Sequence, residues 1–170
     1  DNRSNIVLIG MAGCGKSTVG RKLAGMLDRP FVDTDDLIVL AQNRSLQDIM
    51  DTEGASGFRR IEEDVLLSIN LQDHVIATGG SSIYSAAGMT HLRQNGLIIL
   101  LETGPDVLLQ RVGDAAQRGL VKRPGQKFED LLAERRPLYA RYADLTVDCS
   151  NMDQEGVCRK IISWLKNDYH

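Results

Sequence analysis

Two hydrophobic periodicities alternate along the chain. Short apolar runs are typical of buried parallel strands, whereas longer segments carry apolar residues three or four positions apart, as amphipathic helices do. Strands are predicted at residues 5–9, 31–32, 74–78, 96–101 and 144–148. Helices are predicted at residues 16–27, 37–40, 45–52, 58–69, 84–93, 103–112, 128–142 and 154–166, with a break at 54–57. This alternation favours an α/β fold with a parallel sheet, and we interpret the last helix as a packing element only.

The bulk composition narrows the function classes. With 170 residues, 42% of them hydrophobic, the chain is predicted to form one domain, residues 1–170. A net charge of −3 disfavours nucleic acid as a main partner, and no apolar run approaches membrane-spanning length. Cys14, Cys149 and Cys158 form no C-x-x-C pair, which favours a reducing cytoplasm over disulfides or a zinc site. The first residues lead directly into a strand, so we expect no signal peptide.

The strongest motif lies between the first strand and the first helix. Residues 10–17 read Gly-Met-Ala-Gly-Cys-Gly-Lys-Ser and fit G-x-x-x-x-G-K-[ST], the phosphate-binding P-loop. Glycines let the backbone N–H groups point inward at anionic oxygens, and the helix adds its positive dipole end. Lys16 would reach the β- and γ-phosphates of ATP, and the Ser17 hydroxyl would ligate Mg²⁺. The alternative is a glycine-rich turn that only connects a strand to a helix.

The nucleotide side is therefore predicted around this loop. The Cys14 side chain is interpreted as a variable position of the motif, and the alternative is a thiol activated by the helix N-terminus. The predicted nucleotide-binding residues of the loop are Gly13, Cys14, Gly15, Lys16, Ser17 and Thr18.

Two carboxylates follow the second predicted strand. The carboxyl end of a parallel strand is where ligands bind in such sheets. Asp33 and Asp35 are two residues apart, so in an extended chain they would point the same way. One could hold the metal, and the other could accept a proton from a substrate hydroxyl. The alternative is a helix cap followed by a solvated acidic first turn.

Further candidates for binding an acidic substrate come later in the chain. Arg59 precedes Glu62 and Glu63 at helical spacing, which fits either a surface ion pair or an arginine oriented to clamp an anion. Gly79 and Gly80 follow the third predicted strand, where they either permit close approach of a ligand or form an ordinary turn.

A segment rich in glycine and basic residues separates the last two large helices. Residues 113–127 contain three glycines, and Arg118, Lys122, Arg123 and Lys127 outnumber Asp114. We interpret this segment as a lid that closes over a polyphosphate, with a solvated loop as the alternative. Its cations would neutralise charge that develops in the transition state.

Together these motifs resemble the shikimate kinase family over about residues 6–165. The resemblance implies a three-layer α/β sandwich of the P-loop NTPase and nucleoside monophosphate kinase type. Its five-stranded parallel sheet would have the order 2-3-1-4-5, with a mobile lid at about 113–127 and a substrate-binding helical segment at about 33–62. It also implies MgATP-dependent phosphorylation of the shikimate 3-hydroxyl. The motifs are the P-loop, Asp33-Thr34-Asp35, Phe58-Arg59 with Glu62, Gly79-Gly80, Arg123-Pro124 and Arg135-x-Pro137-x-Tyr139.

Residue roles follow from the resemblance position by position. Asp33, with Ser17, matches the metal-associated position, and Asp35 matches the aspartate that holds the accepting hydroxyl. The catalytic residues would be Lys16, Asp35 and Arg123. The substrate-binding residues would be Asp35, Arg59, Gly79, Gly80 and Arg135, the two arginines meeting the carboxylate. Glu62 matches the residue that orients the first arginine, and Arg118 and Arg123 match nucleotide-binding positions, Arg118 near the adenine.

The sequence departs from the family pattern at two places. Ser81 stands where the family has a third glycine, and Gly125-Gln126 stand where it has leucines. Alternatives therefore stay open: a kinase for another small hydroxy acid such as gluconate, or a kinase-like module that has lost catalysis. A nucleoside monophosphate kinase and a GTPase are disfavoured, the second because the sequence has no Asn-Lys-x-Asp motif. The expected partners are ATP and the acid substrate, and we expect a monomer.

Overall fold

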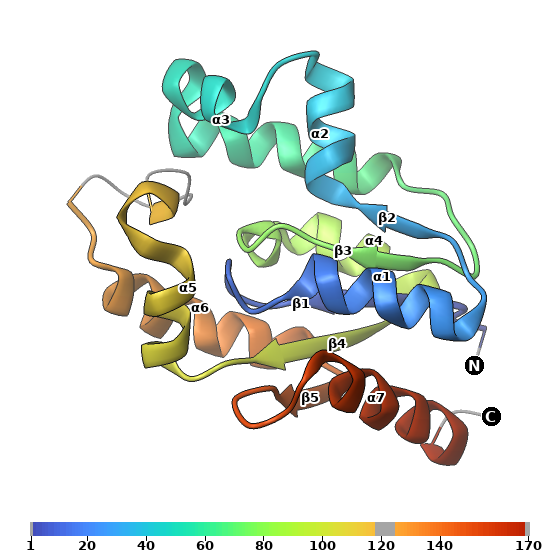
Figure 1. Ribbon diagram of the computed structural model, residues 1–170. Coiled ribbons are helices and arrows are strands. Elements are labelled where there is room, and N and C mark those ends of the chain that lie inside the picture. Colours follow the sequence, from blue (N-terminus) through green and yellow to red (C-terminus); the bar gives the residue numbers. More distant parts are fainter. Residues whose placement is uncertain (1, 118–124, 169–170) are drawn as a thin grey trace.

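The computed structural model describes residues 2–117 and 125–168, with side chains described outside 112–117. Its centre is a five-stranded sheet of order β2-β3-β1-β4-β5, in which every neighbouring pair is parallel (Figure 1). The predicted fold and strand order are confirmed. The strands are β1 (Asn5–Ile9), β2 (Phe31–Asp33), β3 (Val75–Ala77), β4 (Gly96–Glu102) and β5 (Leu145–Asp148).

The apolar runs became strands because both faces of the sheet are covered. All five residues of β1 are buried, and Leu8 pairs with Ala77 of β3 and with Ile99 of β4. β2 and β5 lie at the edges and are only partly buried, which explains their weaker apolar patterns. The carboxyl ends of the central strands therefore meet at one edge of a rigid sheet.

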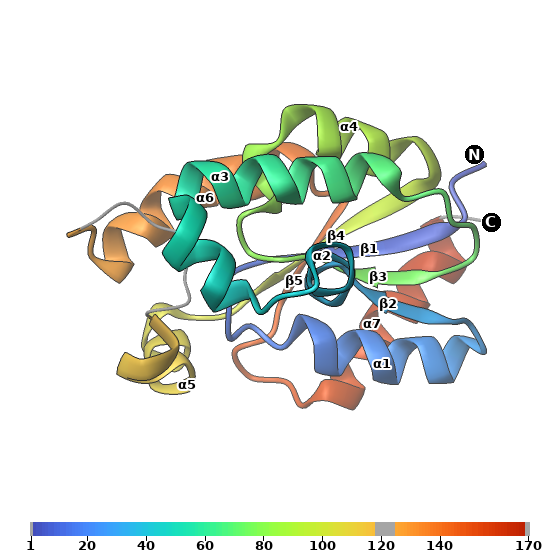
Figure 2. The same ribbon diagram turned by 90° about the horizontal axis from the view of Figure 1, so that it is seen from above.

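Helices form a layer on each face of the sheet. Figure 2 shows α1 and α7 on one face and α3, α4 and α6 on the other, while α5 lies beyond the carboxyl ends of the strands. The helices are α1 (Lys16–Leu27), α2 (Thr34–Gln42), α3 (Leu46–Ser68), α4 (Ala86–Asn95), α5 (Pro105–Gln117), α6 (Phe128–Tyr142) and α7 (Gln154–Asp168), and a short 3₁₀ helix, η1, spans Ser82–Tyr84. None of the helices in the described ranges has both the length and the hydropathy needed to cross a membrane.

A second, smaller hydrophobic cluster holds α2 against α3. Ile38 of α2 packs with Ile49, Phe58 and Val65 of α3, and all four side chains are buried. This cluster fixes the position of Arg59, which follows Phe58, relative to the acidic residues at the start of α2.

The predicted break at 54–57 is confirmed in part, because Gly54 has non-helical angles (φ 70°, ψ −178°) and kinks α3, but the helix resumes directly after it. Two other predictions were wrong. The segment from residue 113 is not all loop, since α5 continues to Gln117. Asp35 is not in extended chain, because α2 begins at Thr34 and Asp33 caps it. In these two cases helix formation outweighed a local glycine or strand signal.

Candidate active site

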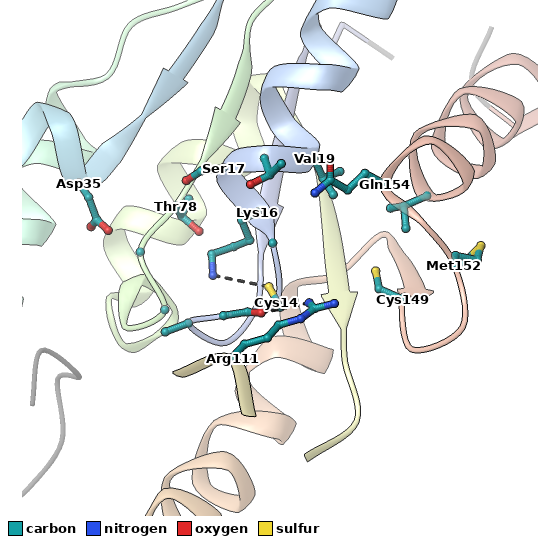
Figure 3. A pocket seen from close by; sticks show the side chains of 17 residues that line it. Cys14, Lys16, Ser17, Val19, Asp35, Thr78, Arg111, Cys149, Met152 and Gln154 are labelled. Atoms are coloured by element: carbon teal, nitrogen blue, oxygen red, sulfur yellow. Dashed lines mark hydrogen bonds between the residues drawn. The ribbon is translucent and has the colours of Figure 1, made fainter. Parts of the chain in front are cut away.

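The P-loop lines a cleft of about 580 Å³ at the carboxyl ends of the strands. Figure 3 shows Asp35 on one flank of this cavity and Gln154 and Met152 on the opposite flank, with Lys16 between them. The cleft therefore has two flanks around the P-loop, one near Asp35 and the other near Gln154 and Met152. The lining residues are Ala12, Gly13, Cys14, Gly15, Lys16, Ser17, Thr18, Val19, Asp35, Thr78, Gly79, Gly80, Arg111, Cys149, Met152, Gln154 and Val157.

The loop has the backbone geometry that its glycines permit. Gly13 and Gly15 have φ angles of 84° and 95°, in the left-handed region that other residues rarely adopt. A Cβ at Gly10 would lie 2.7 Å from the carbonyl oxygen of Leu101, so a side chain at that position would collide with β4. The loop conformation therefore depends on glycine at these positions.

Lys16 is folded back over the loop. Its ammonium group donates hydrogen bonds to the carbonyl oxygens of Gly10 (2.7 Å) and Met11 (2.9 Å), and it lies 3.7 Å from the sulfur of Cys14. The residue is only 8% exposed. The positive charge is thus held at the loop, where a polyphosphate would bind.

Ser17 and Asp33 form a pair of hard oxygen donors beside the loop. The Ser17 hydroxyl donates to Oδ2 of Asp33 at 2.5 Å, while Oδ1 of Asp33 accepts a hydrogen bond from the backbone N–H of Asp35 (2.9 Å). Asp33 is therefore both a helix cap and a neighbour of the P-loop hydroxyl. Two adjacent oxygens fit Mg²⁺, which binds through few protein ligands and keeps water and phosphate oxygens for the rest. No cluster of three or more His, Cys, Asp or Glu suited to a metal occurs among the described residues.

Asp35 lies in the first turn of α2 and lines the cleft. Burial, and after it the neighbouring charge of Asp33, raise the pKa of its carboxyl group to about 6, while the Lys16 ammonium opposes this shift. Such a carboxylate is ionised at neutral pH yet basic enough to accept a proton.

Gly79 and Gly80 bring the two flanks of the site together. A Cβ at Gly79 would lie 2.8 Å from Oδ1 of Asp35, and a Cβ at Gly80 would lie 2.9 Å from Nη1 of Arg135 and 3.4 Å from the backbone nitrogen of Ala12. Tyr139 of α6 fixes this turn, because its hydroxyl donates to the carbonyl oxygen of Gly80 (2.7 Å). The glycines therefore allow the carboxylate, the arginine and the P-loop to approach one another.

The two predicted substrate arginines converge on Tyr84. The guanidinium carbons of Arg59 and Arg135 lie 3.8 and 5.4 Å from the centroid of the Tyr84 ring. Arg135 is 1% exposed, whereas Arg59 is half-buried and lines a smaller hollow of about 130 Å³. That hollow is lined by Arg59, Arg60, Glu62, Glu63, Ser81, Tyr84 and Ser85.

The expected pairing of Arg59 with Glu62 or Glu63 is wrong. No ion pair joins Arg59 to either carboxylate in the described part of the chain. The two oxygens of Glu62 instead accept hydrogen bonds from Ser81 (2.7 Å) and Ser82 (3.2 Å), and Glu63 accepts one from Ser85. Burial raises the pKa of Glu62 to about 7, an effect that the Ser81 hydrogen bond opposes. The serines that follow β3, and not Arg59, are therefore the hydrogen-bond partners of these two carboxylates.

Comparisons with known proteins decide the family. The sequence model of the family described as shikimate kinase matches residues 12–166. The shikimate kinase of Caldanaerobacter subterraneus subsp. tengcongensis is 39% identical over 93% of this chain and 94% of that protein, and the one of Pasteurella multocida is 36% identical over 97% of both. The chain belongs to the shikimate kinase family.

Solved structures of the shikimate kinase family agree with this assignment. The shikimate kinase from Acinetobacter baumannii, solved in complex with shikimate, superposes with a TM-score of 0.88 at 35% identity, covering 98% of this chain and 96% of that one. The shikimate kinase from Aquifex aeolicus gives a TM-score of 0.82 at 32% identity, covering 96% and 97%.

The structure also places residues in the cleft of this shikimate kinase family member that sequence reasoning missed. Arg111 of α5 donates to the carbonyl oxygen of Gly13 (3.2 Å), and Thr78 is buried at the end of β3. Gln154 and Val157, at the start of α7, also line the cleft, which the interpretation of this helix as a packing element did not anticipate. Their sequence pattern is that of an ordinary amphipathic helix, which carries no signal for a ligand.

Two predicted nucleotide-binding residues, Arg118 and Arg123, lie outside the described residues, as do residues 118–124 of the predicted lid as a whole. Cys14 and Thr18 both line the cleft, although Cys14 is buried and Thr18 is exposed. The remaining predicted site residues lie in the cleft or around the Tyr84 ring, apart from Asp33, which is hydrogen-bonded to Ser17.

Proposed function

We propose that this protein transfers the γ-phosphoryl group of ATP to the 3-hydroxyl group of shikimate. The observation that carries the proposal is the turn at Gly79 and Gly80, which packs against Asp35, Arg135 and the P-loop backbone at once. A proton acceptor, a carboxylate-binding cation and a phosphate cradle thus lie around one turn. The family membership supports the same reaction.

On the nucleotide side, the P-loop amides bind the phosphates, and Lys16 exchanges its carbonyl partners for phosphate oxygens. Lys16 then neutralises charge on the transferring group without moving far, because its ammonium already lies over the loop. Ser17 and Asp33 would hold Mg²⁺, which supplies further neutralisation of the phosphate oxygens when bound. From the resemblance we also assign Arg123 to the phosphates and Arg118 to the adenine.

On the acceptor side, Asp35 accepts the hydrogen bond of the substrate hydroxyl and takes its proton as the phosphoryl group transfers. Arg59 and Arg135 bind the carboxylate at the other end of the acid. Two fixed ends leave the hydroxyl little freedom, so the oxygen is held in line with the γ-phosphate. Most of the rate enhancement then comes from positioning and electrostatics.

We further propose that the protein works as a monomer in the cytoplasm. The residues to which we assign the reaction meet within this chain, so the proposed site needs no residue from a second copy. Cys14, Cys149 and Cys158 are unpaired, as they would be in a reducing compartment.

The proposal is tested by a coupled assay of ADP release over a panel of hydroxy acids that includes shikimate and gluconate, each with and without Mg²⁺. Shikimate should give the highest kcat/KM, and activity should require the metal. A higher kcat/KM for gluconate would replace the acceptor and leave the kinase chemistry intact. ATP binding without turnover of any acid would indicate a module that has lost catalysis.

A further inference from the structure

Tyr84, which the resemblance does not assign, contacts both arginines of the acceptor side. Tyr84 ends η1, and its ring centroid lies 3.8 Å from the guanidinium carbon of Arg59 and 5.4 Å from that of Arg135. The two arginines come from α3 and α6, far apart in the sequence. One aromatic ring therefore faces both cations that the proposed function assigns to the carboxylate.

The Tyr84 ring lies against the Arg59 guanidinium group, which forms no ion pair with a described carboxylate. Within the described part of the chain, Arg59 has no carboxylate partner, and its Nε is buried without a hydrogen bond. Glu62, one turn further along α3, is occupied by Ser81 and Ser82. The carboxylate that would otherwise hold this arginine is thus unavailable to it.

Stacking and ion pairing hold an arginine in different ways. A carboxylate partner occupies the in-plane N–H groups of the guanidinium and compensates its charge. An aromatic ring contacts the face of the guanidinium and leaves the in-plane N–H groups and the full charge for another anion. An arginine held by a ring is therefore better prepared to bind a substrate carboxylate bidentately.

Tyr84 is itself held in place. Its hydroxyl donates to Oε2 of Glu134 (2.8 Å), the residue before Arg135 on α6. Burial raises the pKa of Tyr84, so the hydroxyl stays protonated and continues to donate. The ring is thus tied to the same helix that carries the second arginine, and η1 packs against α6.

We propose that Tyr84 is a positioning residue that orients Arg59, with Arg135, toward the carboxylate of the acceptor acid. Tyr84 would thus orient Arg59, the task that the resemblance assigns to Glu62. Glu62 is not needed for this task because it is hydrogen-bonded to Ser81, the residue that stands in place of the third glycine. The inference rests on the proposed function in one respect, that the acceptor carries a carboxylate.

The test measures steady-state kinetics with both substrates varied. Tyr84→Leu should raise the KM for shikimate about tenfold, as expected for loss of a partly buried cation–π contact, while the KM for ATP and kcat stay close to wild type. Tyr84→Phe keeps the ring and should restore most of the affinity. A kcat loss at unchanged shikimate KM would overturn the proposal, because it would indicate general damage to the fold.

A matched control removes another ring that lies under an arginine. The guanidinium carbon of Arg21 lies 5.1 Å from the ring centroid of Phe31 in β2. Phe31 lines neither the cleft nor the smaller hollow beside Arg59. Phe31→Leu should leave the shikimate KM unchanged, so an equal rise in both variants would overturn the specific role of Tyr84. In an Arg59→Ala background, Tyr84→Leu should add little, whereas fully additive losses would show that Tyr84 does not act through Arg59.

The wild-type protein separates this proposal from the proposed function. If it phosphorylates shikimate, the KM comparison decides on Tyr84 alone. If it prefers another hydroxy acid, the proposed acceptor fails, and the same comparison with that acid still decides on Tyr84. If its acceptor carries no carboxylate, both proposals fail.

Discussion

The two sides of the cleft are built in different ways. The nucleotide side comes from consecutive residues, 10–18, in which a strand, a glycine-rich turn and a helix N-terminus follow one another. The acceptor side is assembled from α2, α3, the turn after β3, η1 and α6. Local backbone geometry therefore defines the first side, whereas tertiary packing defines the second.

The two sides also differ in what constrains their residues. The P-loop keeps its motif because three glycines have positive φ angles that other residues adopt at a cost. On the acceptor side, Ser81 and Ser82 after β3 donate hydrogen bonds to Glu62, and Arg59 is stacked on Tyr84 instead. An assembled site can thus exchange one contact for another while its elements stay in place.

The largest effect is expected for Lys16→Ala, which removes the charge of the nucleotide side. This side chain is the described ammonium closest to the phosphate cradle, and we expect kcat to fall about 10³-fold or more. Single-turnover and steady-state assays measure the loss, and circular dichroism checks the fold. A folded variant with more than a tenth of wild-type kcat would contradict the assigned role.

The next largest effect is expected for Asp35→Asn, which removes the proton acceptor that joins the two sides. We expect kcat to fall about 10²- to 10⁴-fold, since the amide cannot take the proton. The wild-type kcat/KM should fall below about pH 6, because burial raises the pKa of Asp35 to that value and only the ionised form acts as a base. If the pKa of Asp35 were that of an ordinary carboxyl group, the fall of kcat/KM on the acid side would occur at lower pH.

The pH profile of Asp35→Asn completes this test. The variant should lose the acid limb together with its activity. A limb that persists at about pH 6 would assign it to another group, and Glu62 is the neighbouring candidate because burial raises its pKa to about 7.

A smaller and more selective effect is expected for Arg59→Ala, which tests the assembled side alone. We expect the KM for shikimate to rise about 10- to 100-fold, as for the loss of a charged hydrogen-bond partner, while the KM for ATP stays unchanged. The coupled assay, with shikimate and ATP varied in turn, measures the two KM values separately. Equal rises in both KM values would mean that the two sides are not independent.

The smallest effect is expected for Cys14→Ser, which changes a P-loop side chain but not the backbone. The loop amides bind phosphate in either variant, so the KM for ATP should change by less than about threefold. The buried site makes a modest loss of thermal stability the main consequence. An ATP KM raised tenfold would favour the alternative in which the thiol itself matters.

Several features followed directly from the sequence. The P-loop, five strands and the order of helices were predictable because each depends on residues close together in the chain. The boundary after Val112 was less predictable, because α5 continues through a glycine that often ends a helix, whereas Gly54 does kink α3 as a glycine there predicts. The expectation that Asp33 and Asp35 point the same way in extended chain was wrong, because α2 begins between them. Asp35 nevertheless lines the cleft, and Asp33 is hydrogen-bonded to Ser17 of the P-loop.

The sequence by itself determined the phosphate cradle and the family, because a glycine-rich loop between a strand and a helix has few alternative conformations. Only the tertiary structure decided which contacts hold the acceptor side. The partners of Glu62, Arg59 and Arg135 lie on other elements, and no spacing along the chain reports a contact that packing creates. The role of Tyr84 could be inferred only from the structure, in which η1, α3 and α6 meet around its ring.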